Sequence, residues 1–251
     1  MKELKYPIYQ TEYGYLTETI QKKYITWAMV AKLLPKDAHR MPEILSLKAP
    51  NDVKKPIQFW QLYSVLGQDP IVGMVGNFYQ LVFADEQWFS DVFSRAGDVN
   101  HHIGTQASMW LDVMGGGSYY HGSEYRLNFH HTHNAHILMD EKGANRWAEL
   151  MTKALKSSQH FMTDDPRVQP SINTFLTYFF DKYANDFNFK NHEIFGETNP
   201  PFKRKINFMN MTAKSINALS TEELRDALIN REVNLSGKYS KAELVQKALN
   251  L

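Results

Sequence analysis

The chain of 251 residues contains no cysteine. This absence excludes disulfide bonds, cysteine-ligated metal clusters and thiol catalysis. No apolar run approaches the roughly 18 residues that a membrane-spanning helix needs, so no transmembrane segment is predicted. The first twenty residues are interrupted by polar and charged side chains and have no apolar core of a secretory signal. We therefore expect a soluble protein of the cytoplasm or of an organelle matrix.

A large charge excess is also missing, because 28 Lys and Arg face 27 Asp and Glu. The balance is uneven along the chain, since the stretch from Lys203 to the end holds nine basic against five acidic residues. A hydrophobic content of 43% and a charged content of 22% are typical of a globular protein with a full core. The length exceeds the roughly 100–200 residues of a common domain, which indicates one domain with appendages or two domains.

Strands are not predicted, because no segment alternates convincingly between apolar and polar residues. Apolar residues recur instead at three- and four-residue steps, as one face of a helix requires. The sequence therefore predicts an all-α protein. The expected helices cover residues 17–34, 57–66, 69–82, 88–93, 104–114, 125–133, 141–157 and 170–185.

Histidine is concentrated in one stretch, since seven of the ten histidines lie between Asn100 and Trp147. Neutral imidazole is a ready ligand for iron, zinc or copper. Three glycines, 115–117, end the helix over 104–114, because glycine adopts the left-handed conformation at little cost. The next helix carries Phe129 and His133 four residues apart on one face. Two helices that face each other across a slot, one of them supplying a strong axial ligand, are what a haem pocket needs.

An ordered set of motifs spans a little over half of the chain. It comprises Phe78-Tyr79 in NFYQLVFADEQWF, DVF ending in Phe93, Gln106 followed by WLDVMGGG, the cluster His130–His136, and ANRWAELMTKAL around Trp147. With these motifs, the region from about Ile57 to Phe189 resembles the truncated haemoglobins, and within them the second, plant-like group. The resemblance implies a 2-on-2 globin fold and haem b as the cofactor.

The resemblance also assigns roles to single residues. An ungapped count from the glycine corner makes His133 the iron ligand, although one extra residue before Trp147 leaves His130 and His131 as alternatives. Tyr79, Gln106 and Trp147 would hydrogen-bond an iron-bound ligand, His102 would be the distal gate or a sixth ligand, and Phe93 would pack against the porphyrin. The expected cofactor-binding set is His133, Tyr79, Phe93, His102, Gln106, Trp147 and Phe129, with His133 on the metal.

Other interpretations of the same residues stay open. The cluster His130–His136 could hold zinc or non-haem iron, since His-X-His spacing suits a metal site. Such a site needs further ligands, and Glu124, Asp140 and Glu141 are the carboxylates nearby. The pair His101-His102 could simply be a solvated helix start, with Asp98 or Asn100 as the N-cap.

The ends of the chain lie outside the region of resemblance. We expect an N-terminal extension over 1–55, a globin-like domain over 56–190, a linker over 191–214 and a helical module over 215–251. Two capping boxes, Ser220 with Glu223 and Ser240 with Glu243, start two short helices in that module. A helix, an extended link and a helix resemble the SAP motif, which is often associated with nucleic acids, although acidic residues dilute its basic face.

Two functions follow as hypotheses. The first is a haem globin that binds O₂ or another diatomic ligand, with nitric-oxide or peroxide chemistry as an extension. The second is a structural subunit that keeps the globin fold without using haem and docks protein partners through its N-terminal extension and SAP-like tail.

Overall fold

The structure is a computed structural model that describes residues 9–192, 194–204 and 206–251, with no description of the side chains of 159–162. The first eight residues of the predicted extension therefore lie outside the described residues, as does Lys205. Within the described part, no helix is long and apolar enough to cross a membrane. The chain divides after Phe202 into two compact units, each with its own hydrophobic core.

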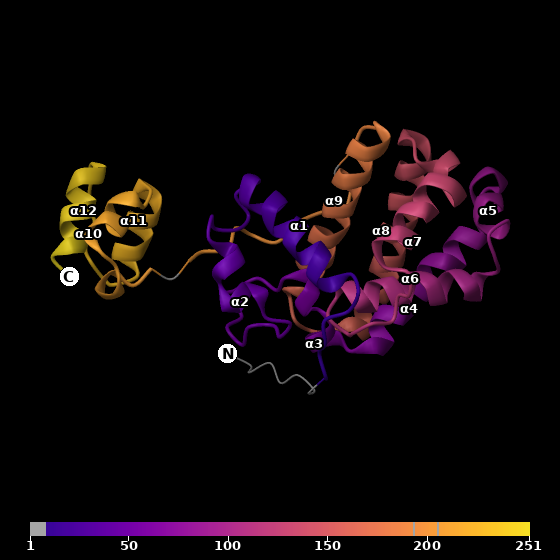
Figure 1. Cartoon of the computed structure of the whole chain (residues 1–251), viewed down its shortest axis with the longest axis horizontal. Helices are drawn as coiled ribbons and strands as arrows, with labels where there is room; N and C mark the ends of the chain where they lie inside the picture. The colour runs from indigo at the N-terminus through magenta and orange to yellow at the C-terminus, as the bar shows by residue number, and fades with distance from the viewer. Residues whose placement is uncertain (1–8, 193, 205) are drawn as a thin grey trace. The chain divides into compact units, whose positions relative to one another are not determined.

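The first unit is helical (Figure 1), as the sequence predicts. Its elements are α1 (Thr17–Val30), η1 (Ala38–Arg40), α2 (Pro42–Leu45), η2 (Phe59–Gln61), α3 (Tyr63–Leu66), α4 (Gln68–Phe83), α5 (Gln87–Ser94), α6 (Val99–Val113), α7 (Ser123–Phe129), η3 (His130–Asn134), η4 (His136–Leu138), α8 (Glu141–Met162) and α9 (Val168–Phe187). Helix α4 packs against both α6 and α8. These helices enclose the cavity described below.

Local signals in the sequence account for the ends of α6. The helix begins at Val99 because the carboxylate of Asp98 accepts a hydrogen bond from the His101 amide at 2.8 Å. It ends at the glycine corner, where Gly115 has a φ of +94°. A Cβ atom at Gly115 would lie 2.3 Å from the carbonyl oxygen of Trp60, so only glycine fits there.

The predicted N-terminal extension contributes to the core of the first unit. Helix α1 is tied to α6 by Asp112, which is fully buried. Its Oδ1 accepts hydrogen bonds from the amides of Leu16 at 3.0 Å and Thr17 at 3.2 Å. Asp112 therefore acts as an N-cap for α1 from a distance of 95 residues in the chain.

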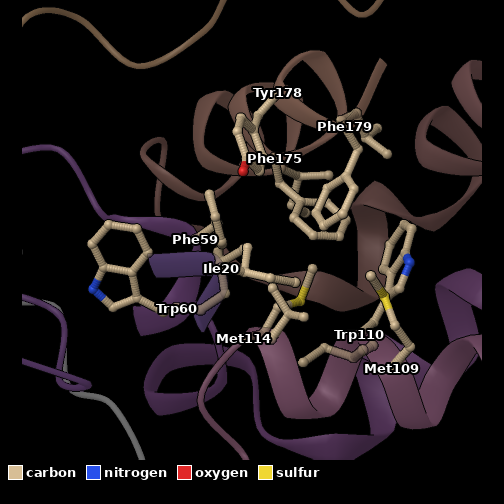
Figure 2. Packing of buried hydrophobic residues seen from close by; sticks show 14 of the residues in the cluster. Ile20, Phe59, Trp60, Met109, Trp110, Met114, Phe175, Tyr178 and Phe179 are labelled. Atoms are coloured by element: carbon tan, nitrogen blue, oxygen red, sulfur yellow. The ribbon is translucent and has the colours of Figure 1, made fainter. Parts of the chain in front are cut away.

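Aromatic rings fill the space between α1, η2 and α9. The ring of Tyr24 lies 4.9 Å from that of Phe59 and 5.4 Å from that of Tyr178, centroid to centroid. Figure 2 shows Phe59 and Tyr178 in this core, together with Phe175 and Trp110. The ring centroids of Trp110 and Phe175 are 5.0 Å apart, and both side chains also line the cavity. These two residues therefore connect the aromatic core to the cavity wall.

The first unit also reaches beyond the predicted globin-like domain, up to Phe202. Buried Asn199 donates from Nδ2 to the carbonyl oxygen of Ile57 at 2.8 Å, and the Phe202 amide donates to the carbonyl oxygen of Leu33 at 2.9 Å. These contacts attach part of the segment predicted as a linker to the first unit.

The second unit contains η5 (Phe208–Asn210), α10 (Ala213–Ala218), α11 (Thr221–Ile229) and α12 (Lys241–Leu249). Both predicted capping boxes are confirmed: Ser220 caps α11 with Glu223, and Ser240 caps α12 with Glu243. Leu224, Leu228 and Leu244 are fully buried and form the centre of the small core.

Candidate functional site

A cavity of about 330 Å³ lies within the first unit. This volume is within the range of sites for small molecules and cofactors. Its walls come from α4, α5, α6, α7, η3, α8 and α9, and most of the lining side chains are aromatic or apolar. The polar groups fall into two sets, one on α7 and η3 and the other on α4 and α6.

The first set is built around His131, whose ring lines the cavity. Its Nδ1 lies 2.8 Å from the carbonyl oxygen of Leu127, one helical turn earlier. A carbonyl oxygen only accepts, so Nδ1 carries the proton and Nε2 keeps its lone pair. Burial lowers the pKa of His131 to about 3, so the imidazole is neutral near pH 7. The ring also lies against Tyr183 of α9, with the centroids 4.2 Å apart.

The other two candidate histidines differ in position. His130 lines the cavity beside His131, and burial lowers its pKa. His133 does not line the cavity: its ring is exposed and stacks on that of Phe129 at 4.2 Å and 11°. The sequence predicted that His133 would face the pocket, but the neighbouring face of this short helix, with Leu127 and His131, is the one turned inward.

The chain changes its helical geometry at this point. Element η3 is a π-helical turn, and the amide of Ala135 donates to the carbonyl oxygen of His130 five residues earlier, at 2.9 Å. Single π turns within helices occur frequently at functional sites. A π turn contains one residue more than an α-helical turn. It therefore changes the residue spacing from which the sequence predicted His133 as the axial ligand.

The second polar set consists of Tyr79, Gln106 and His102. The Tyr79 hydroxyl donates to Oε1 of Gln106 at 2.7 Å and so orients the amide. Nε2 of Gln106 is buried and has no hydrogen-bond partner among the described residues, so it can donate to a ligand. Nε2 of His102 lies 2.8 Å from the carbonyl oxygen of Phe93, and its ring stacks on Tyr79 at 5.3 Å. Burial raises the pKa of Tyr79, so its hydroxyl stays protonated.

The remaining predicted residues are aromatic and also line the cavity. Trp147 of α8 packs against Phe78 at 4.8 Å, Phe93 is buried, and Phe129 is 43% exposed. The cavity therefore brings together all the predicted cofactor-binding residues except His133. Sequence reasoning missed Tyr183, although it continues the inward series of Phe175 and Phe179 by one more helical turn.

A metal site made of protein ligands alone is not found at this place. Among the described residues, no three His, Asp or Glu side chains converge as such a site requires. His130 and His131 instead line a cavity that is walled largely by aromatic rings and is also lined by the polar side chains of Tyr79 and Gln106.

Comparison with known families shows which family the segment around this cavity resembles. Residues 61–180 match the model of the bacterial-like globins. Residues 61–180 form a globin domain. The match lies within the region of resemblance predicted from the sequence, and it does not extend to the second unit. No curated protein and no solved structure gave a match to the chain.

Globins as a class carry haem, and the cavity of this globin domain fits that group. Neutral His131 keeps an Nε2 lone pair, and among the described residues Nε2 of Gln106, which lines the same cavity, has no hydrogen-bond partner. The aromatic lining suits the apolar faces of a porphyrin. The donor set and the lining therefore agree with what the family implies.

Proposed function

We propose that this chain binds haem in the cavity with His131 as the axial ligand, and that it binds O₂ or another diatomic molecule on the opposite side. The observation that carries the proposal is the hydrogen bond from Nδ1 of His131 to the Leu127 carbonyl oxygen. A metal-binding histidine usually donates its second ring N–H to such an acceptor, which fixes the ring and makes Nε2 more basic. The bound haem would supply an iron centre for diatomic ligands and for one-electron chemistry.

The contacts of the three candidate histidines favour His131 as the axial ligand. His133 is exposed and stacked on Phe129, so it would need the helix to rotate before it could bind the iron. His130 lines the cavity, but among the described residues no hydrogen bond orients its ring as the Leu127 carbonyl orients that of His131. His131 therefore requires the least rearrangement.

The far side of the cavity supports the binding of a polar diatomic ligand. Nε2 of Gln106 is a donor that could hydrogen-bond bound O₂, whereas the Tyr79 hydroxyl would first have to give up its hydrogen bond to Oε1 of Gln106. Trp147 lines the same cavity. This combination favours the second, plant-like group of truncated haemoglobins. His102 would have to give up its contact with the Phe93 carbonyl before it could bind the iron as a sixth ligand.

The test is a titration of the haem-free protein with haemin, followed by reduction and addition of CO. We expect a Soret band that shifts with CO. His131→Gly should lose the axial-ligand signature and regain it when free imidazole is added, because imidazole can fill the space that the side chain leaves. His133→Gly is the matched control and should behave like the parent.

Two results would contradict the proposal at different points. A protein without a Soret band after haemin addition would favour a globin fold that serves as a structural subunit. A normal spectrum in His131→Gly, with loss of the signature in His133→Gly or His130→Gly, would move the axial ligand to that residue.

A further inference from the structure

Three readily oxidised side chains form a triangle between α1 and α9. The ring centroids of Tyr24 and Trp27 are 5.6 Å apart, those of Tyr24 and Tyr178 are 5.4 Å apart, and those of Trp27 and Tyr178 are 5.7 Å apart. Tyr24 and Tyr178 are buried, whereas Trp27 is only half-buried. Trp27 therefore brings this cluster to the surface of the first unit.

The triangle is connected to the cavity through one helix. Tyr183 of α9 lines the cavity and lies against His131, and its ring is 6.0 Å from that of Phe179. The Phe179 ring is in turn 5.3 Å from that of Tyr178, and Figure 2 shows both side chains projecting from α9. A continuous series of packed rings thus leads from the cavity to Trp27. Tyr183, Tyr178 and Trp27 are its oxidisable members on this route.

The geometry points to Trp27 as a second site of this protein, at which one-electron donors of the phenol or ascorbate class are oxidised while a hydroperoxide is reduced in the cavity. This inference rests on the proposed haem binding. Trp27 lies outside residues 61–180, so the site belongs to the segment that precedes the family match.

The reaction balances without a further reactant. Reduction of a hydroperoxide to an alcohol and water breaks the O–O bond and takes up two electrons and two protons. Two donor molecules each give up one electron at Trp27 and release one proton to water. Each electron passes by way of Tyr178 and Tyr183 to the cavity, and each phenol that loses a proton on oxidation regains one on reduction. The three side chains are therefore unchanged after each turnover.

Two other routes to the surface provide comparison. Trp88 of α5 is half-buried and contacts the cavity lining through Phe89, at 5.5 Å, without a tyrosine or second tryptophan in between. Tyr125 is 78% exposed and stacks on Phe129, which lines the cavity. A route through Tyr125 would predict a different site of oxidation, so an experiment can separate it from the route through Trp27.

The test uses the full chain loaded with haemin, tert-butyl hydroperoxide as oxidant and the dye ABTS as a donor too large for the cavity of about 330 Å³. We expect Trp27→Phe and Tyr178→Phe each to lower kcat/KM for the dye about tenfold, while Trp88→Phe, the matched control, stays within about twofold of the parent. A spin trap followed by peptide mass spectrometry should place the hydroperoxide-dependent adduct on Trp27. The Soret band and the CO spectrum should be the same in all variants.

An unchanged rate of dye oxidation in Trp27→Phe, or an adduct on Tyr125 in place of Trp27, would overturn the inference and leave haem binding intact. Absence of a Soret band in the parent would overturn both proposals. The haem spectrum therefore tells the two failures apart.

Discussion

Single backbone carbonyls orient two of the histidines that line the cavity, His131 and His102. The carbonyl oxygen of Leu127 contacts Nδ1 of His131, and that of Phe93 contacts Nε2 of His102. Each accepts a hydrogen bond from one ring nitrogen, so each ring is fixed in one tautomer when it is neutral. The histidine that the haem proposal needs as a ligand keeps Nε2 free, whereas His102 uses Nε2 in its contact.

The burial of His102, like that of His130 and His131, makes the stability of the haem-free protein depend on pH. Burial lowers the pKa of His102 below its ordinary value, although the hydrogen bond to Phe93 opposes this shift. The unfolded chain therefore binds a proton at this residue before the folded protein does, and stability falls as the pH drops below about 6.5. The slope of the unfolding free energy against pH should therefore be smaller in His102→Gln than in the parent. We expect the difference in the haem-free protein to be up to about 1.4 kcal/mol per pH unit.

The measurement for His102 is urea unfolding of the haem-free protein at several pH values between neutral and acidic conditions. The matched control is His101→Gln, because the side chain of His101 is exposed on the same turn of α6. An equal slope in the parent and in His102→Gln would mean that this residue does not link protonation to folding.

At the scale of elements, one carboxylate joins α1 to α6. The Oδ1 atom of Asp112 accepts hydrogen bonds from two amides at the start of α1, and burial raises the pKa of this carboxyl although the hydrogen bonds oppose the shift. Removal of the acceptor in Asp112→Ala should lower the free energy of unfolding by about 2 kcal/mol. Asp112→Asn should cost less, because it keeps an acceptor oxygen and buries no charge.

Urea unfolding followed by circular dichroism at neutral pH would measure both variants. Asp98→Ala, which removes the local N-cap of α6, provides a comparison and should cost about 1 kcal/mol. If Asp112→Ala proved as stable as the parent, the long-range cap would contribute nothing to the attachment of α1.

At the scale of the whole molecule, the two units have separate hydrophobic cores. Deletion of residues 203–251 should therefore leave the melting temperature and the haem spectrum of the remaining chain unchanged. Deletion of residues 1–55 should prevent stable folding, because it removes Tyr24, Ile20 and Ala28 from the larger core. Thermal melts of both deletion variants, followed by circular dichroism, test this contrast.

The opposite pattern would be informative. A chain without residues 203–251 that melts at a clearly lower temperature would show that the second unit stabilises the first. A chain without residues 1–55 that still melts cooperatively at the temperature of the full chain would show that α1 is dispensable for the globin domain.

Features that depend on near neighbours along the chain could be predicted from the sequence alone. The all-α class, the glycine corner after α6 and the two capping boxes of the second unit each rest on side chains within a few residues of the backbone that they stabilise. For the cap of α6 the sequence left Asp98 and Asn100 open, and the structure shows Asp98. The ordered motifs between Ile57 and Phe189 were also enough to predict a globin domain, and the family match confirms it.

Contacts between side chains that are distant in the chain could not be predicted from the sequence, because they depend on how the helices pack. Helix α7 and the turn η3 that follows it offer two faces, one with Leu127 and His131 and one with Phe129 and His133, and periodicity over so short a segment does not tell them apart. Packing against α9, which brings Tyr183 onto His131, turns the first face inward. The burial of α1 likewise depends on Asp112, a partner distant in the chain, and no pattern along the sequence encodes a contact of that kind.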